Sequence, residues 1–96
     1  MKYAVFWTNT ALSDLKAIHG YLLEVTDRAT ATRLIKDIRQ ATRLLPEQPR
    51  MYAIFPESAA QVRHITVHAW RLLYIVDDAQ RTCRVLSVTH AARQFP

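Results

Sequence analysis

Basic and histidine side chains lie among aliphatic residues in the last third of the chain, between residues 62 and 93. This segment consists of three runs rich in β-branched and aromatic residues, which two short connections separate. A strand directs its side chains to alternate faces, so a cation within such a run points in a defined direction. Arginine in this setting can bind a phosphate or a carboxylate bidentately. The candidate target-binding residues are Arg63, His64, Arg71, His90 and Arg93.

Some of these residue types suit metal-free cleavage of RNA. That reaction needs a base for the 2′-hydroxyl, an acid for the leaving oxygen, and cations for the charge at phosphorus. His90 could act as acid or base, and Arg71 with Arg93 could supply the charge. A tyrosine or carboxylate that would complete the set is not evident, because alternation puts Tyr74 on the opposite face from Arg71. The catalytic set is therefore incomplete.

Arg71 has two interpretations. Its guanidinium could form an ion pair with Asp77 or Glu57, or it could be exposed on a free sheet face and bind a target. In the second case we expect Arg71, His90 and Arg93 to converge near one rim of the sheet. The alternative for His90 and Arg93 is a structural role that holds the C-terminal segment against the sheet.

Several kinds of site are excluded by composition. The chain has one glycine, so a phosphate-binding loop and a dinucleotide fingerprint are absent, and it has no His-Glu zinc motif or serine-hydrolase elbow. Its four histidines, His19, His64, His68 and His90, lack metal-ligand spacing. The lone Cys83 excludes an intramolecular disulfide and a cysteine-based zinc site. We therefore expect no metal and no cofactor, and a reducing, cytoplasmic location.

The size and charge of the chain fit a small domain with an anionic partner. Its 96 residues form one domain, 1–96, of which half are hydrophobic. The net charge is +5, divided into +2 over residues 1–61 and +3 over residues 62–96. We expect no membrane association, because no apolar run approaches the ~20 residues of a bilayer span and no signal-peptide pattern is present.

The first half of the chain predicts a strand and two helices. Residues 3–8 are β-branched and aromatic, and Thr8 or Thr10 can cap a helix at about 9–25. A cap signal at Thr26-Asp27 begins a second helix at about 28–45, which Pro46 ends. Gly20 lies inside the first helix at a cost of ~1 kcal/mol relative to alanine, which close packing or a bend would explain. The two apolar stripes are Ala11, Leu15, Ile18, Leu22, Val25 and Ala31, Leu34, Ile35, Ile38, Ala41, Leu44, Leu45.

The predicted architecture follows from the order of these elements. An irregular connection at 46–61 precedes strands at about 62–67, 70–78 and 83–90. The order β-α-α-β-β-β predicts an α+β fold with a four-stranded, largely antiparallel sheet. The helical hairpin covers one sheet face and leaves the other face or its rim free. Four apolar residues of the connection, at least two of which we expect to pack in the core, are Met51, Tyr52, Ile54 and Phe55.

Motifs in nearly every predicted element carry a family resemblance. They are Trp7-Thr8, Ala11-x-x-Asp14-Leu15-x-x-Ile18-x-x-Tyr21-Leu22, Ala29-x-Ala31, Leu45-x-x-x-Pro49-Arg50, Val62-Arg63-x-Ile65-x-Val67, Arg71-x-x-Tyr74 and Val85-Leu86-x-Val88-x-His90-x-x-Arg93. In the order and spacing of these motifs, the chain resembles the RelE/ParE superfamily of bacterial type II toxins. The resemblance implies a toxin with this fold and a cognate antitoxin that neutralises it in a hetero-oligomeric complex. It makes Met51, Tyr52, Ile54 and Phe55 the candidate antitoxin-binding residues.

The two branches of this superfamily imply different actions. RelE-like members cleave ribosome-bound mRNA without a metal, with strand lysines, two arginines and a C-terminal tyrosine. Arg71 and Arg93 match the arginines, but His64 and Thr66 stand at the lysine positions and no tyrosine follows Arg93. The Asp14-Leu15-x-x-Ile18-x-x-Tyr21 helix is more similar to ParE-like members, which inhibit DNA gyrase. A non-catalytic gyrase inhibitor that arrests growth is therefore the expectation, and a RelE-like endoribonuclease acting on mRNA at the ribosome is the alternative.

Overall fold

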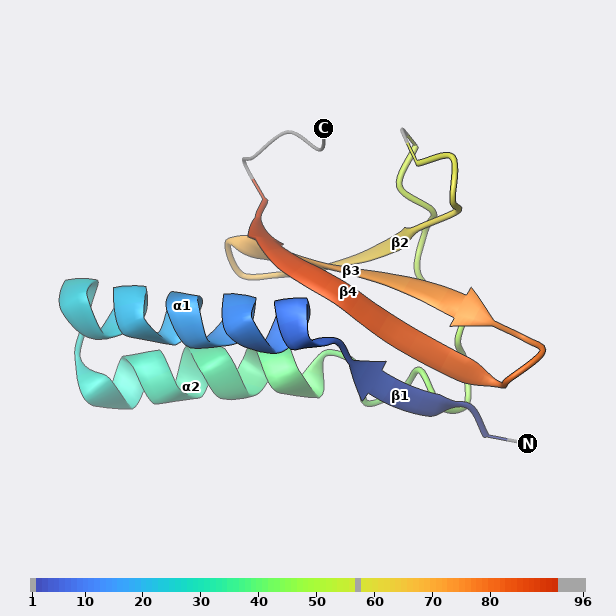
Figure 1. The fold of residues 1–96 in the computed structure, drawn as a ribbon. Helices are drawn as coiled ribbons and strands as arrows, with labels where there is room; N and C mark the ends of the chain where they lie inside the picture. Colours follow the sequence, from blue (N-terminus) through green and yellow to red (C-terminus); the bar gives the residue numbers. More distant parts are fainter. Residues whose placement is uncertain (1, 57, 92–96) are drawn as a thin grey trace.

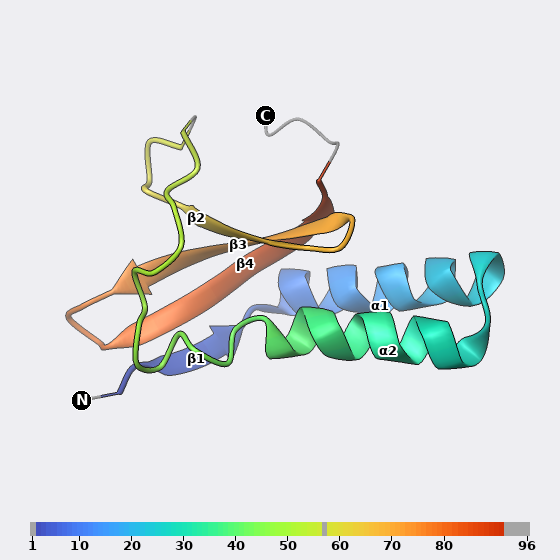
Figure 2. The same cartoon turned by 180° about the vertical axis from the view of Figure 1, so that it is seen from behind.

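The chain folds into two helices and four strands in the order predicted from the sequence. The computed structural model describes residues 2–56 and 58–91. The elements are β1 (Ala4–Trp7), α1 (Asn9–Val25), α2 (Arg28–Gln40), β2 (Arg63–Val67), β3 (Trp70–Asp77) and β4 (Thr82–His90). Figure 1 shows the helices as a hairpin beside a twisted, open sheet. Figure 2, the view from behind, shows the connection between α2 and β2 running past the sheet. The α+β prediction is confirmed.

The strands form one sheet in the order β1-β4-β3-β2. β2 pairs with β3 and β3 with β4, both antiparallel, so the last three strands form the predicted meander. β1 pairs parallel with β4, from Ala4 beside Thr82 to Trp7 beside Val85. The sheet is thus mixed but largely antiparallel, and its parallel pair has the long connection that such a pair needs.

Both helices begin at side-chain caps. Thr8 precedes α1, where its hydroxyl accepts a hydrogen bond from the Ala11 amide at 3.1 Å and donates one to the Leu86 carbonyl at 3.0 Å. Asp27 precedes α2 and accepts a hydrogen bond from the Thr30 amide at 2.7 Å. These bonds satisfy first-turn amides that have no partner within a helix. The Thr8 bond to Leu86 also attaches the start of α1 to β4.

The second helix is shorter than predicted. α2 ends at Gln40 rather than near residue 45, and the chain continues in turns through Glu47. Hydrogen bonds in these turns join residues three apart, such as the Leu45 amide to the Thr42 carbonyl at 3.1 Å. Ala41 and Leu45 are nevertheless buried, so the apolar pattern continues past the end of the helix. Periodicity alone therefore could not place this boundary.

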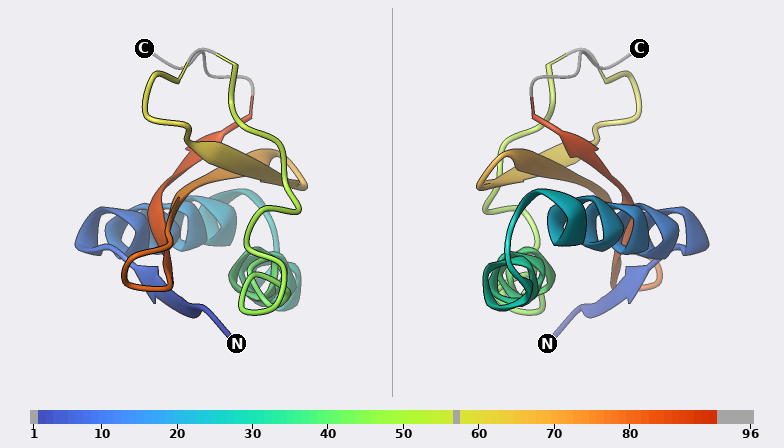
Figure 3. Two further views of the ribbon diagram at one scale, coloured as in Figure 1. Left: turned by 90° about the vertical axis from the view of Figure 1, so that its right-hand side faces the viewer. Right: turned by 90° about the vertical axis from the view of Figure 1, so that its left-hand side faces the viewer.

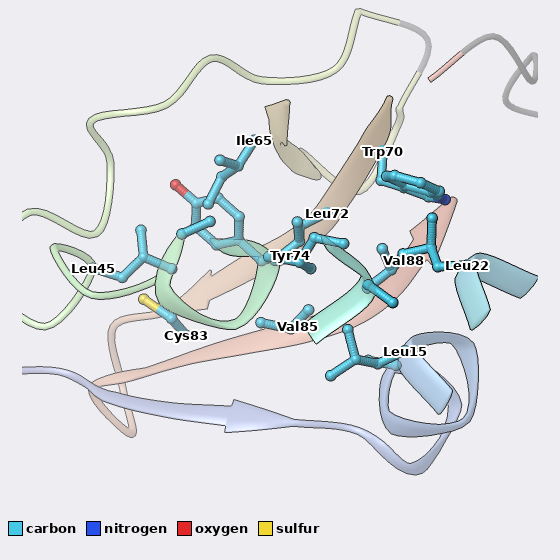
Figure 4. Close-up of a cluster of buried hydrophobic side chains, with 14 residues drawn as sticks. Leu15, Leu22, Leu45, Ile65, Trp70, Leu72, Tyr74, Cys83, Val85 and Val88 are labelled. Atoms are coloured by element: carbon cyan, nitrogen blue, oxygen red, sulfur yellow. The ribbon is translucent and has the colours of Figure 1, made fainter. Parts of the chain in front are cut away.

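The main core lies between the hairpin and the sheet face that bears Trp70, Leu72 and Tyr74, which we call the helix side. Figure 4 shows these side chains meeting helical residues and others from β4. Tyr74 is fully buried, and its hydroxyl donates to the Pro49 carbonyl at 2.8 Å. Among the predicted stripe residues, Val25 and Leu44 are exposed. The buried members of this core are Ala11, Leu15, Leu22, Ala31, Ile38, Ala41, Leu45, Ile65, Trp70, Leu72, Tyr74, Cys83, Val85 and Val88.

A second, smaller core covers part of the opposite face of the sheet, which we call the outer face. Phe55 and Val62 from the 46–62 connection pack there on Leu73, with Ile75 and Leu86 at its margin. The Phe55 amide donates to the Val62 carbonyl, which holds the connection against the start of β2. The outer face is therefore only partly free. Within the described residues, neither helix is long and apolar enough to cross a membrane.

Candidate functional site

Strand register determines which candidate residues share a surface. On β3, the burial of Trp70, Leu72 and Tyr74 on the helix side places Arg71 on the outer face, as the sequence predicts. Arg71 lies opposite Thr66 of β2 and Thr89 of β4. His64 lies opposite Leu73, whose side chain belongs to the outer core, so His64 is on the outer face too.

Arg71 and His64 meet on the ring of Phe55. The Arg71 guanidinium carbon lies 5.2 Å from the Phe55 ring centroid, within cation–π range. The His64 and Phe55 ring centroids are 5.4 Å apart, with the rings at 84°. Because Phe55 is buried in the outer core, it holds both polar groups in place. We call Phe55, His64 and Arg71 the outer-face cluster.

Two polar atoms of the outer-face cluster are buried without a partner. Arg71 Nε and His64 Nδ1 have no hydrogen-bond partner among the described residues. Burial, and to a smaller extent the charge of Arg71, lowers the pKa of His64, so its imidazole is neutral at pH 7. A neutral imidazole beside a guanidinium can donate or accept a hydrogen bond while the guanidinium binds an anion. The cluster is thus suited to recognising an anionic or polar group.

The ion pair that was one of the two interpretations of Arg71 is not present in the described part of the chain. Asp77 instead accepts a hydrogen bond from the Gln80 amide at 3.2 Å within the β3–β4 turn. Glu57, the other carboxylate considered from the sequence, lies outside the described residues. Within residues 2–56 and 58–91, therefore, no carboxylate forms a salt bridge with the Arg71 charge.

His90 lies on the other side of the sheet from Arg71. It pairs with Trp70 across β3 and β4, and the two ring centroids are 6.0 Å apart at 77°. The expectation that Arg71, His90 and Arg93 converge is therefore wrong for Arg71 and His90, because neighbouring positions along paired strands face opposite ways. Arg93 lies outside the described residues.

His90 borders a pocket between α1 and the end of the sheet. The pocket has a volume of about 270 Å³ and lies between residues of α1, β3 and β4. At its wall, Asp14 Oδ2 accepts a hydrogen bond from the Val88 amide at 3.0 Å, which ties the helix to β4. The sequence did not single out this carboxylate as a site residue, and its signal was its place in the Asp14-Leu15-x-x-Ile18-x-x-Tyr21 motif. The lining residues are Asp14, Ala17, Ile18, Tyr21, Trp70, Val88, Thr89 and His90.

Arg63 uses its donors within the chain. Its guanidinium donates to the Tyr52 carbonyl at 2.6 Å and to the Arg50 carbonyl at 3.3 Å. It faces the helix side, because it lies opposite Tyr74. These bonds anchor the 46–62 connection to β2, so the structure gives Arg63 a positioning role, and its contact with a target stays a prediction.

The four apolar candidates of the connection divide into two pairs. Phe55 is buried in the outer core, and Tyr52 packs on the main core with its ring edge toward Tyr74. The expectation that at least two of the four pack in the core is confirmed. Met51 and Ile54 are 44% and 39% exposed, so they remain accessible to a partner.

Groups for metal or tyrosine chemistry are not gathered at the outer-face cluster. Burial raises the pKa of Tyr74 to about 12, and this hydroxyl faces the helix side. Within the described residues, no group of three histidine, cysteine, aspartate or glutamate side chains could hold a metal ion. Among the described residues, the outer-face cluster brings together one imidazole and one guanidinium.

Comparisons with known proteins agree with this architecture. A protein-family model described as the ParE toxin of the type II toxin–antitoxin system parDE matches residues 5–95. A comparison with curated protein sequences finds no match.

Solved structures share the fold. A chain of the chromosomal ParDE system of P. aeruginosa superposes with a TM-score of 0.80 at 20% identity, covering 93% of this chain and 96% of that one. The RelBE2 toxin–antitoxin complex of Mycobacterium tuberculosis gives 0.70 at 24% identity, covering 94% and 99%. A mutant of E. coli RelE in the free state gives 0.70 at 19% identity, covering 96% and 86%. The fold is thus shared across both branches of the superfamily, and the match over residues 5–95 shows that this chain belongs to the ParE toxin family of type II toxin–antitoxin systems.

Proposed function

We propose that this ParE-family toxin arrests bacterial growth by inhibiting DNA gyrase, and that it does so by binding rather than by catalysis. The observation that carries the proposal is the placement of Arg71 and His90 on opposite faces of the sheet. A cleaved phosphate needs its acid, base and cations around one point. The side chains of Arg71 and His90 leave opposite faces of the sheet, which supports a binding action over cleavage at one point.

The outer-face cluster is the proposed target-binding surface. It presents an arginine that forms no salt bridge in the described chain, next to a buried histidine nitrogen without a partner. Both groups are held by a buried aromatic ring, so little side-chain entropy remains to be lost when they bind. A target would meet the partly exposed Arg71 guanidinium, whereas Arg71 Nε and His64 Nδ1 are themselves buried.

The alternative function is ribosome-dependent cleavage of mRNA. One observation favours it, namely that the neutral imidazole of His64 lies close enough to Arg71 for the arginine charge to affect its pKa. A base and a cation would then share the outer face. A leaving-group acid would have to come from elsewhere, which makes this the weaker proposal.

We also propose a cognate antitoxin as partner, in a cytoplasmic toxin–antitoxin complex. The intact RelBE system of E. coli and the RelBE2 system of Mycobacterium tuberculosis, which share this fold, were both solved as toxin–antitoxin complexes. Met51 and Ile54 offer exposed apolar surface here. A small, partly acidic antitoxin whose tail folds on binding would suit that surface and the net charge of +5.

Controlled expression in bacteria tests both proposals. The chain alone should arrest growth, and co-expression of an adjacent small open reading frame should relieve the arrest. Arrested cells should accumulate DNA damage before any change in mRNA integrity. Cells that grow normally at good soluble expression would contradict a toxin role, and early cleavage of mRNA with intact DNA would favour the alternative.

A further inference from the structure

The basic residues of α2 and its following turn form a second charged surface, remote from the outer-face cluster in sequence. Arg33, Lys36 and Arg39 recur at a spacing of three, which places them along one side of α2, and Arg43 follows in the turn after the helix. All four are exposed. We call them the α2 stripe. Figure 3 shows α2 end-on at the margin of the molecule, where such a surface is accessible.

The charge of this segment is nearly of one sign. Residues 28–43 hold five Lys/Arg, the stripe plus Arg28, and one acid, Asp37. Asp37 is engaged by His68, whose Nε2 lies 2.8 Å from its Oδ2. Within the described chain, no carboxylate forms a salt bridge with a stripe residue. The net charge of +2 over residues 1–61 does not reveal this basic segment, because the acids of residues 1–61 lie mostly outside α2.

One member of the α2 stripe serves the fold, because Arg43 donates a hydrogen bond to the Gln40 carbonyl at 3.2 Å, but the stripe charges also repel one another. Like charges three and four positions apart destabilise a helix, and carboxylates that would offset the repulsion are not in place. Arg39 also makes an aromatic contact, with its guanidinium carbon 5.7 Å from the Trp7 ring centroid. A row of cations kept at this cost suggests use as a binding surface.

The neighbouring side chains decide what kind of partner fits. The remaining exposed residues of α2 on this side are small or polar, namely Ala29, Thr32 and Gln40. Protein interfaces depend on large apolar or aromatic anchors at their centre, and none is exposed on α2 itself, although Leu44 beside Arg43 is exposed. Contacts to a nucleic-acid backbone need only cations and polar groups, and arginine binds phosphate bidentately.

We propose that the α2 stripe binds the phosphate backbone of duplex DNA without reading its sequence. The helical part of the stripe, from Arg33 to Arg39, is about 9 Å long at the rise of an α-helix, so it can contact two or more phosphates of one strand. This binding does not depend on gyrase being the toxin's target. A toxin held on DNA by one surface would keep its outer-face cluster free for a protein.

A DNA-binding assay with the purified full chain tests the proposal. Fluorescence anisotropy measures its affinity for labelled duplexes of roughly 20 base pairs at salt concentrations from about 50 to 200 mM. Two unrelated sequences should bind equally, and affinity should fall steeply with salt. The R33Q/K36Q variant should bind roughly ten- to a hundred-fold more weakly at about 100 mM salt, and its salt slope should be lower by about 2. The matched control K2Q/R84Q removes the same charge from exposed sites outside the stripe and should bind almost as the wild type does.

Three results would overturn the proposal. The first is equal weakening in both variants, which would assign binding to net charge alone. The second is the absence of duplex binding even at the lowest salt. The third is tighter binding of an oligoglutamate peptide or of duplex RNA than of DNA, which would make the partner an acidic protein or RNA. Circular dichroism of both variants should show wild-type folding.

Discussion

Arg71 and His90 lie one register position apart on β3 and β4, yet their side chains leave opposite faces of the sheet. Arg71 rests on Phe55 over the outer face, whereas His90 packs beside Trp70 above a pocket that α1 borders. The two residues therefore belong to two surfaces. A ligand held by one of them has the sheet between it and the other, so each surface can be tested alone.

Replacing Arg71 should weaken toxicity without unfolding the protein. The R71M variant keeps an apolar stem over Phe55 and removes the charge, so thermal stability should change little. Loss of a charged interface contact costs ~2–5 kcal/mol of binding, which should appear as much weaker growth arrest at equal expression. R84M is a matched control, because Arg84 is exposed and lies opposite Ile75 on the same face. A stable R71M variant that remains fully toxic would remove the outer-face cluster from the mechanism.

The lowered pKa of His64 predicts a pH-dependent stability. The unfolded chain takes up a proton on this residue near pH 6.5, whereas burial and the Arg71 charge resist it in the folded state. The unfolded state then binds more protons, so stability should fall as the pH drops below about 6.5. Urea unfolding at several values between about pH 5 and 7 should show a smaller decrease for H64Q than for the wild type. Parallel curves for the two proteins would show that His64 titrates normally.

Asp14 should contribute to stability through its bond to the Val88 amide. D14A removes the acceptor and leaves a partly buried amide unpaired, which should cost ~1–3 kcal/mol in the free energy of unfolding. D14N retains an acceptor oxygen at the same position and should lose less. Thermal melts of the two variants measure the difference. If both variants melt at the wild-type temperature, the hydrogen bond between Asp14 and the Val88 amide does not contribute to stability.

Gly20 should be replaceable with a gain in stability. A Cβ added there meets no atom within 4 Å, so the close packing considered from the sequence does not explain this glycine. G20A should therefore stabilise α1 by ~0.5–1 kcal/mol and raise the melting temperature by several degrees. A17G, at another exposed position of the same helix, should lower it by a similar amount. A decrease for G20A would mean that Gly20 has a role that the described contacts do not contain.

Local patterns predicted the elements of this fold well, because caps and alternation are short-range signals. Thr8 and Asp27 cap their helices through side-chain bonds, and alternation placed Tyr74 and Arg71 on opposite sides of β3. The end of α2 was missed because burial continues at Ala41 and Leu45 after the helical hydrogen bonds stop.

The candidate site was less predictable, since it depends on which strands pair and in what register. The sequence separates Arg71 from His90 by a turn and most of a strand, and only the register shows that they face apart. The contact of Phe55 with Arg71 joins a connection to a strand, which periodicity does not describe. The α2 stripe was not predicted, because the net charge of half the chain does not show how basic residues are arranged along one helix.

Purified protein tests the proposed function most directly in two assays run side by side, one of DNA supercoiling by gyrase and one of mRNA integrity on translating ribosomes. We predict that the wild type inhibits supercoiling in a dose-dependent way and leaves the mRNA intact, and that R71M inhibits far less. Cleavage of ribosome-bound mRNA with gyrase unaffected would contradict this prediction and establish the ribonuclease alternative.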